Sequence, residues 1–498
     1  MDNSHLIIIL KTLNKKEFKD FGLFLTSPIF NREKVFINFF DYLKKKFPDF
    51  SENDVTKEKI YSALYPGKKY NDSMMRKLIS EFTRLAEDYI SLMIYNQNHF
   101  EKNNNLLKYF RRHGLIKHFA KRKEKNEQTL DNMIYKNETY FINKYITEDE
   151  TRRLNQSLKN KAHYFKNNFE VISESLTIAS IINILKINMH TINYEKNYFG
   201  SKLSLSLFDE IDNYLSKNKE KYENIIYIKF YYNCFKLLQT EEEKYYFELK
   251  DILEKELNKL LPKNKSGLFS VMGNYCYLRV MHGDLNYIKE QFFIYKTNIE
   301  SEFYKQQQNY LPHILYLNTM ILGLESGETK WVENFVERKI DELNLEVREN
   351  LKNFSYSLIN LHKKNYDKAL EYSVIIQTND VGLKHQIKSL MLKIYFEKND
   401  ADGFYSHIDS YRHFISNDKL ISDDNKKMFS NYINYSKKLF DIKQLEDNFD
   451  KEFQLKKIKD EIINNKFMIN KSWLLNRFTE MESGNPRKNI LTREKRDD

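Results

Sequence analysis

Glycine and proline are scarce in this sequence, with 12 Gly and 6 Pro among 498 residues. Strand-rich folds need these residues for hairpins and loops, so the low counts argue against a β-rich protein. No proline lies between Pro66 and Pro262, and only Gly67, Gly114 and Gly200 interrupt that span. Long helices joined by short connections explain such a stretch. We therefore expect an all-α fold.

Cysteine is scarcer still, since only Cys234 and Cys276 occur, both in apolar runs. Two such residues exclude a disulfide framework and a four-thiolate zinc site, and we expect buried, reduced thiols. The N-terminal apolar run, Leu6 to Leu10, is too short to cross a bilayer and lacks a small-residue cleavage site. The sequence thus predicts no membrane span and a cytoplasmic location.

Motifs that carry known chemistries are missing as well. There is no glycine-rich phosphate loop, no His-Glu-x-x-His and no Gly-x-Ser-x-Gly. The nearest histidine pairs, His113 with His118 and His407 with His413, are five and six residues apart, so they do not share a helical face. We expect no catalytic residues, no metal and no cofactor, and hence no enzyme. A metal site assembled across helices and an enclosed enzymatic pocket stay open as alternatives.

Enough apolar material is present for a packed interior, because 41% of the residues are hydrophobic and 15% aromatic. The length favours several domains or an elongated array.

The pattern of residues 1–97 predicts an N-terminal helical unit. One stripe joins Phe36, Phe39, Phe40, Leu43 and Phe47 and stops at Pro48, a second helix begins near Thr56, and a third is capped by Asn71 and buries Met75, Leu78, Phe82, Leu85, Tyr89 and Leu92.

Residues 98–220 predict a region of long helices. Thr147, with Glu150 three residues later, has the pattern of a capping box that would open a helix. The run from Ile178 to Met189 is apolar on nearly all sides, which is typical of a helix between neighbours.

Residues 221–482 predict stacked helical hairpins. Tyr222 to Leu238 form an apolar helix, and Thr240 with Glu243 suggest a second capping box, opening a helix that runs to Pro262. Further turns are expected at Gly283-Asp284, Ser326-Gly327, Asn365-Tyr366 and Asn399-Asp400, each between helix-length apolar patterns. Beyond them, residues 483–498 form a polar segment without an apolar stripe, which predicts a disordered tail.

Two stretches resemble signatures of a bacterial family of long, uncharacterised helical proteins, namely Thr26 to Asn31 and Leu64 to Asp72. Glu138 to Phe141 and Trp473 to Leu475 resemble its later blocks, so the resemblance extends over nearly the whole chain. It implies a helical fold and no particular activity.

Asn365 to Leu370 resembles the turn and second-helix start of a tetratricopeptide repeat, and the next turn follows at Asn399, 34 residues later, which is the length of such a repeat. Ser357 stands where the first helix needs a small residue, whereas Asn360 and Ser373 replace large apolar ones.

Other turns are more widely spaced, such as the 44 residues from Gly283 to Gly327. We therefore predict an α-solenoid-like stack of degenerate tetratricopeptide-like hairpins.

The strongest candidate for a functional site is a cluster of basic residues, since residues 101–130 contain nine Lys or Arg and three Glu. Tyr109, Phe110 and Phe119 lie among these cations, as in a phosphate-binding surface with stacking groups. Helical geometry favours a simpler interpretation, in which the aromatics face the core and the cations face water. The candidate basic surface comprises Lys108, Arg111, Arg112, Lys117, Lys121, Arg122, Lys123 and Lys125.

The leading hypothesis from sequence is a non-catalytic protein–protein interaction scaffold, whose stacked hairpins present a concave groove to a protein or peptide partner. The alternative is a nucleic-acid-binding protein that uses the basic surface. Neither the partner nor the pathway follows from the sequence.

Overall fold

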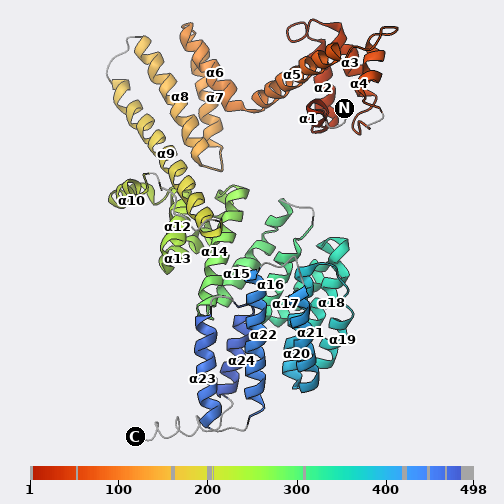
Figure 1. Ribbon diagram of the computed structural model, residues 1–498. Coiled ribbons are helices and arrows are strands. Elements are labelled where there is room, and N and C mark those ends of the chain that lie inside the picture. Colours follow the sequence, from red (N-terminus) through yellow and green to blue (C-terminus); the bar gives the residue numbers. More distant parts are fainter. Residues whose placement is uncertain are drawn as a thin grey trace. The chain divides into compact units, whose positions relative to one another are not determined.

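The computed structural model (Figure 1) describes residues 4–51, 54–158, 163–198, 205, 207–306, 310–417, 423–445, 449–465 and 468–483. Within these residues the chain forms 24 α-helices and three short 3-10 helices, and no strand occurs there. The all-α prediction is confirmed. The chain divides into two compact units. The N-terminal unit comprises Met1–Ile134 and Glu138–Ala179, and the C-terminal unit comprises Tyr135–Asn137 and Ser180–Asp498.

The N-terminal unit begins with five helices around an aromatic core. Phe18 stacks on Phe40 with ring centroids 4.9 Å apart, and Phe39 stacks on Phe82 at 4.6 Å. The Asn71 side chain accepts a hydrogen bond from the Met74 amide, which confirms the predicted helix cap. These helices are α1 (His5–Lys11), α2 (Lys15–Thr26), α3 (Lys34–Lys44), α4 (Lys57–Leu64) and α5 (Asp72–Gln97).

Three further helices, α6 (His99–Arg112), α7 (Ile116–Asp131) and α8 (Glu138–Ser157), pack together in the same unit. The predicted capping box at Thr147 and Glu150 is wrong, because both residues lie inside α8 and are buried. Their side chains instead meet neighbouring helices: Asn126 of α7 donates to the Thr147 hydroxyl, and Arg111 of α6 pairs with Glu150. Helix α9 (His163–Tyr198) follows and contains the apolar run predicted from Ile178.

The C-terminal unit is a stack of helical hairpins, in which each helix from α12 onward contacts the next along the chain (Figure 1). Alternate helices also meet, as α12 with α14 and α18 with α20. Its helices are α10 (Phe208–Lys217), α11 (Lys219–Tyr222), α12 (Ile226–Thr240), α13 (Glu243–Lys255), α14 (Pro262–Met281), α15 (Tyr287–Glu300), α16 (His313–Glu325), α17 (Thr329–Lys339), α18 (Leu345–His362), α19 (Tyr366–Val374), α20 (Val381–Lys398), α21 (Ala401–Asn417), α22 (Asp423–Lys443), α23 (Phe449–Asn464) and α24 (Lys471–Ser483). The 3-10 helices are Leu257–Lys259, Phe303–Gln306 and Ile340–Glu342.

All four predicted turns fall between consecutive helices. Gly283 and Gly327 adopt φ of 96° and 85°, and Asn399 adopts φ of 59°, values at which glycine and asparagine are tolerated best. The second capping box is wrong, however. Thr240 ends α12 instead of opening α13, because Glu241 takes a left-handed conformation there and reverses the chain.

The two turns that lie 34 residues apart, at Asn365 and Asn399, are each followed by a small residue four positions after the asparagine. Ala369 is fully buried, and the Ser357 hydroxyl donates to its carbonyl at 2.6 Å. A Cβ atom on Gly403 would lie 2.7 Å from the Tyr395 ring. Close helix contact therefore requires small side chains at both places. The tetratricopeptide resemblance itself stays a prediction.

Helix α24 contacts α14, which lies far back along the chain, as well as α22 and α23. Lys471, at its first turn, is 2% exposed and donates to the carbonyl of Met281 at the end of α14. It also donates to the carbonyls of Ile463 and Asn465 at the end of α23, at 2.7 and 3.2 Å. One ammonium group thus caps two helix C-termini and holds α24 against them.

The domain boundaries drawn from sequence stay predictions. The one at residue 97 coincides with the end of α5, and the one at residue 220 falls within α11. Apart from Ser483, which ends α24, the predicted tail lies outside the described residues.

Candidate functional site

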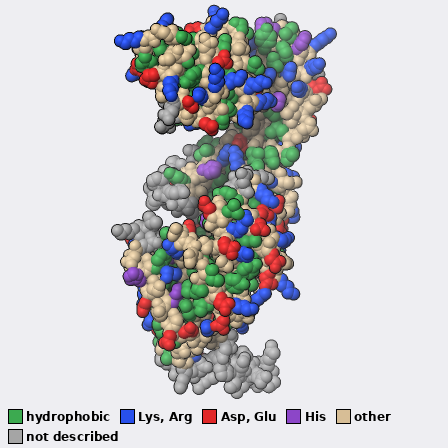
Figure 2. Space-filling view, turned by 90° about the vertical axis from the view of Figure 1, so that its right-hand side faces the viewer, with side chains coloured by type: hydrophobic (Ala, Val, Ile, Leu, Met, Phe, Trp, Pro, Cys, Tyr) green, Lys and Arg blue, Asp and Glu red, His purple; other side chains and the backbone are tan. Residues whose placement is uncertain are grey.

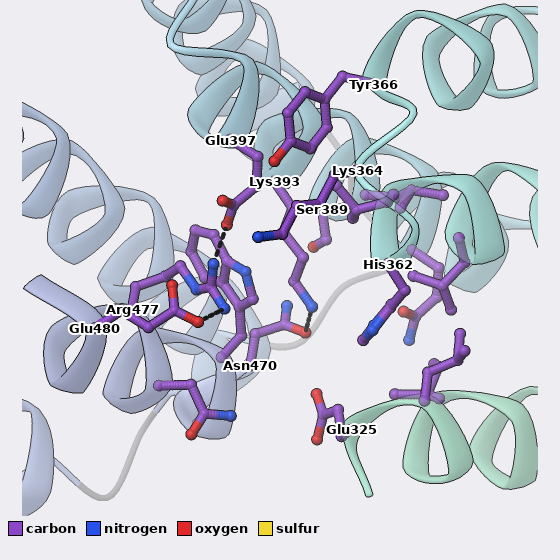
Figure 3. Close-up of a pocket in the computed structure, with 18 of the residues that line it drawn as sticks. Glu325, His362, Lys364, Tyr366, Ser389, Lys393, Glu397, Asn470, Arg477 and Glu480 are labelled. Carbon is purple, nitrogen blue, oxygen red and sulfur yellow. Dashed lines mark hydrogen bonds and ion pairs between the residues drawn. The ribbon is translucent and has the colours of Figure 1, made fainter. Parts of the chain in front are cut away.

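Helices α16, α18, α20 and α24 enclose a cavity of about 550 Å³ in the C-terminal unit, called the charged cavity below (Figure 3). Glu325 ends α16, His362 ends α18, Lys393 and Glu397 lie on α20, and Arg477 lies on α24. These residues come from four helices that the hairpin stacking brings together. Ionisable groups in a concave, partly apolar space are the features by which binding sites are recognised.

Lys393 and Glu325 face the same space in Figure 3 but form no ion pair with each other. The Lys393 ammonium donates to Asn470 Oδ1 at 2.9 Å. The Ser472 hydroxyl donates to the Glu325 carboxylate, at 3.3 and 3.1 Å from its two oxygens. Burial raises the pKa of Glu325 and lowers that of Lys393, and their mutual attraction opposes both shifts. Each of the two groups is therefore desolvated and has a neutral hydrogen-bond partner.

The remaining charges of the charged cavity are paired with one another. Arg477 bridges Glu397 at 2.9 Å and Glu480 at 2.7 Å. Burial raises the pKa of Glu397, against the pull of Arg477. The His362 ring borders the cavity, where desolvation first, then Lys393 and Arg477, lower its pKa, although the residue also keeps contact with solvent. At neutral pH this histidine is uncharged.

A second cavity, of about 530 Å³, adjoins the first and shares Glu325, Gln386, Ser389 and Asn470 with it. Helices α14, α15, α16, α20 and α22 and the residues leading into α24 line it. Across the two cavities the amides of Asn274, Gln386 and Asn476 have no hydrogen bond in the structure. Asn274 and Gln386 are exposed, so both cavities open to solvent.

The residues of the predicted basic surface lie on α6 and α7 in the N-terminal unit, and three of the eight point into contacts within it. Arg111 pairs with Glu150 at 2.6 Å, Arg122 donates to Asn103 at 2.9 Å, and Lys123 lies 3.5 Å from Glu148. The other five are exposed: Lys108, Arg112, Lys117, Lys121 and Lys125.

The aromatics of this segment divide in the same way. Phe119 is 2% exposed and Phe110 partly buried, whereas Tyr109 is 55% exposed, which corrects the expectation that all three face the core. Figure 2 shows the Lys and Arg side chains across the N-terminal unit, and their closer mixing with Asp and Glu on the C-terminal unit. Residues 1–179 carry 32 Lys and Arg against 23 Asp and Glu, whereas residues 180–498 carry 49 against 47.

The charged cavity escaped the sequence analysis, although one signal was present. Lys393 interrupts an apolar run from Leu390 to Phe396, where an ordinary surface lysine is out of place. Its partner Asn470 lies 77 residues away, and Ser472 lies 147 residues from Glu325. No pattern at helical spacing joins groups so far apart.

Both cysteines are buried, and burial raises the pKa of both thiols, that of Cys276 to about 12. They are therefore neutral thiols at physiological pH. Among the residues that the structure describes, no three His, Cys, Asp or Glu side chains gather in a geometry that could hold a metal ion.

No protein-family model, curated protein or solved structure matches this chain. Of the helices in the described residues, none is both long enough and apolar enough to cross a bilayer. The two family resemblances noted in the sequence stay predictions.

Proposed function

We propose that this protein is a non-catalytic protein-interaction scaffold, and that its two adjoining cavities receive an extended peptide segment of a partner. The observation that carries the proposal is the set of unpaired amides of Asn274, Gln386 and Asn476, which come from α14, α20 and α24. A carboxamide offers a donor and an acceptor at once, as a peptide group does. Amides spaced along a groove suit a polypeptide backbone of varied sequence, and stacked hairpins commonly bind partners on their concave side.

The test is a photo-crosslinking residue inside the cavities. Tyr277 lines the second cavity and is 45% exposed, so benzoylphenylalanine can replace it with little change in packing. Phe247 on α13 is 50% exposed and lines neither cavity, which makes it the matched control. We expect position 277 to crosslink to a polypeptide and position 247 to yield none. Mass spectrometry of the crosslinked peptide would map the bound segment.

Adding Gln386→Ala to the crosslinking protein should reduce the yield, since it removes one of the unpaired amides. An equal yield at positions 277 and 247, or none at 277, would count against the scaffold proposal.

A second candidate function, nucleic-acid binding, draws support from one observation. Lys117, Lys121 and Lys125 are exposed and follow each other at four-residue steps, so they form one row along α7. Exposed Tyr109 offers a stacking face on neighbouring α6. A row of cations suits a phosphate backbone, and an exposed aromatic ring suits a stacked base.

This candidate is tested with a fluorescent single-stranded oligonucleotide at low salt. Replacing Lys117, Lys121 and Lys125 by Glu should abolish binding. The matched control replaces Lys15, Lys16 and Lys19 by Glu, because these residues are also exposed, lie in the same unit and change the net charge equally. Equal losses in both triple variants would indicate attraction by net charge alone, and absence of binding at low salt would remove the candidate.

A further inference from the structure

We infer that the partner segment carries an acidic and a basic side chain close together, the acidic one meeting Lys393 and the basic one meeting Glu325. This inference rests on the proposed scaffold function and adds the chemistry of the partner. It follows from two ionisable groups of opposite sign, Lys393, which is 9% exposed, and the partly buried Glu325, that line one cavity and form no ion pair.

The contacts of these two charges leave capacity for a ligand. An ammonium group has three donors, and the Lys393 ammonium uses one of them on Asn470 and lies 5.7 Å from the centre of the Trp473 ring. The Glu325 carboxylate accepts from a single hydroxyl, that of Ser472. Neither neutral partner compensates a buried charge as an ion would.

Competing ions within the charged cavity are already engaged. Arg477 is held between Glu397 and Glu480, and His362 is neutral at physiological pH. Lys364 also borders the cavity but is exposed, so water solvates it. A ligand with one sign of charge could form an ion pair with only one of these two groups. A ligand with both signs serves both.

The chain itself indicates the spacing. Asn470 reaches Lys393 and Ser472 reaches Glu325, so side chains two positions apart on one polypeptide can contact both ions. A bound segment that replaces or flanks these neutral groups would present its acidic and basic residues at a similar separation. We therefore expect a motif in which one residue separates an acidic residue from a basic one.

The experiment selects displayed random 12-residue peptides on the full-length protein and on two variants, Glu325→Gln and Lys393→Met. The wild type should enrich peptides with the acidic–x–basic motif or its reverse. Glu325→Gln should keep the acidic preference and lose the basic one, and Lys393→Met should do the opposite. For a selected peptide, each variant should weaken binding about tenfold or more, since a charge-assisted hydrogen bond is lost.

The matched control uses the surface pair of Asp367 and Lys398, which lines neither cavity. Asp367→Asn and Lys398→Met should leave the selected motif unchanged. Thermal unfolding confirms that each variant is folded, and Lys393→Gln replaces Lys393→Met if the latter is not.

The outcomes separate the two proposals. Peptides enriched without charge preference, or with the same preference on wild type and both cavity variants, would overturn the charge inference and leave the scaffold proposal standing. Failure of the wild type to enrich any peptide would overturn the scaffold proposal and the inference with it.

Discussion

Polar groups are buried in both units, but their partners differ. Between α6, α7 and α8, Asn126 donates to Asn104 and to Thr147, and Arg111 pairs with Glu150. In the charged cavity, by contrast, Lys393 and Glu325 each meet only a neutral group. In the first arrangement, polar side chains on neighbouring helices are each other's hydrogen-bond and ion-pair partners. In the second arrangement, two ionisable groups of opposite sign line an open space without forming an ion pair.

This difference separates polar side chains that are buried to hold helices together from polar side chains that are buried beside a binding cavity. A paired network fixes how three helices pack, and removing one member leaves another buried without a partner. Ions that face a cavity contribute little to packing, so their cost in free energy of unfolding is expected to be offset by binding a partner. Substitutions in the two regions should therefore change stability by different amounts.

The largest effect is expected for Arg111→Met, which removes the counterion of Glu150, a residue that is 5% exposed. An uncompensated buried carboxylate should lower the free energy of unfolding of the N-terminal unit by about 3 kcal/mol. Urea denaturation with hydrogen exchange of the α6 and α8 amides measures it. The double variant Arg111→Met with Glu150→Met should recover most of the loss, and a loss below about 1 kcal/mol in the single variant would place this pair among weak surface bridges.

Lys471→Met should follow, with a loss of about 2 kcal/mol for the C-terminal unit, because the carbonyls that end α14 and α23 lose their donor. The matched control is Lys459→Met, since Lys459 contacts only side chains, a half-exposed pair with Glu482 and the Phe478 ring, and caps no helix carbonyl, so it should cost less than about 1 kcal/mol. Urea unfolding of both variants checks the order. Equal losses would mean that Lys471 does not hold α24 against the stack.

A pH effect should come next. Burial lowers the pKa of His407 to about 4, against the hydrogen bond that its ring makes with the Lys388 carbonyl. The unfolded state binds a proton near pH 6.5 and the folded state does not, so stability is lost as the pH falls from about 6.5 to 4. His407→Gln should make the melting temperature less dependent on pH over that range. His413→Gln, at an exposed position, should leave this dependence unchanged. A slope unchanged in His407→Gln would assign the pH dependence to other groups.

The smallest effect is expected for Lys393→Met, although it is the same substitution as at Lys471. Methionine keeps most of the apolar stem and removes a desolvated charge, so the free energy of unfolding should change by less than about 1 kcal/mol or rise. Urea denaturation beside Lys471→Met measures the contrast directly. A loss above about 2 kcal/mol would make Lys393 a structural residue and erase the distinction between the two regions.

Much of the fold could be predicted from the sequence because its signals are local. The Asn71 cap lies next to the apolar stripe that begins at Met75, and both appear as predicted. The turns at Gly283 and Gly327 were visible because left-handed backbone favours glycine. The pattern at Thr147 and Glu150 misled, since Ser or Thr followed by Glu also occurs within helices, where a neighbouring helix decides which groups pair.

The candidate sites were predicted less well. Eight cations were assigned to one basic surface. Three of them point inward, because Arg111 and Lys123 form ion pairs with acidic residues of α8, and Arg122 donates a hydrogen bond to Asn103. Lys393 stood out only as a lysine within an apolar run. Its role depends on Glu325 and Asn470, which lie on other elements of the stack.

The sequence alone determined the all-α fold, the Asn71 cap and the hairpin turns, because apolar period, caps and left-handed positions act over a few residues. Only the tertiary structure decided which polar side chains are buried and what they face. Those partners come from helices tens to more than a hundred residues away, as Ser472 and Glu325 do, and the free energy of a buried charge depends on them.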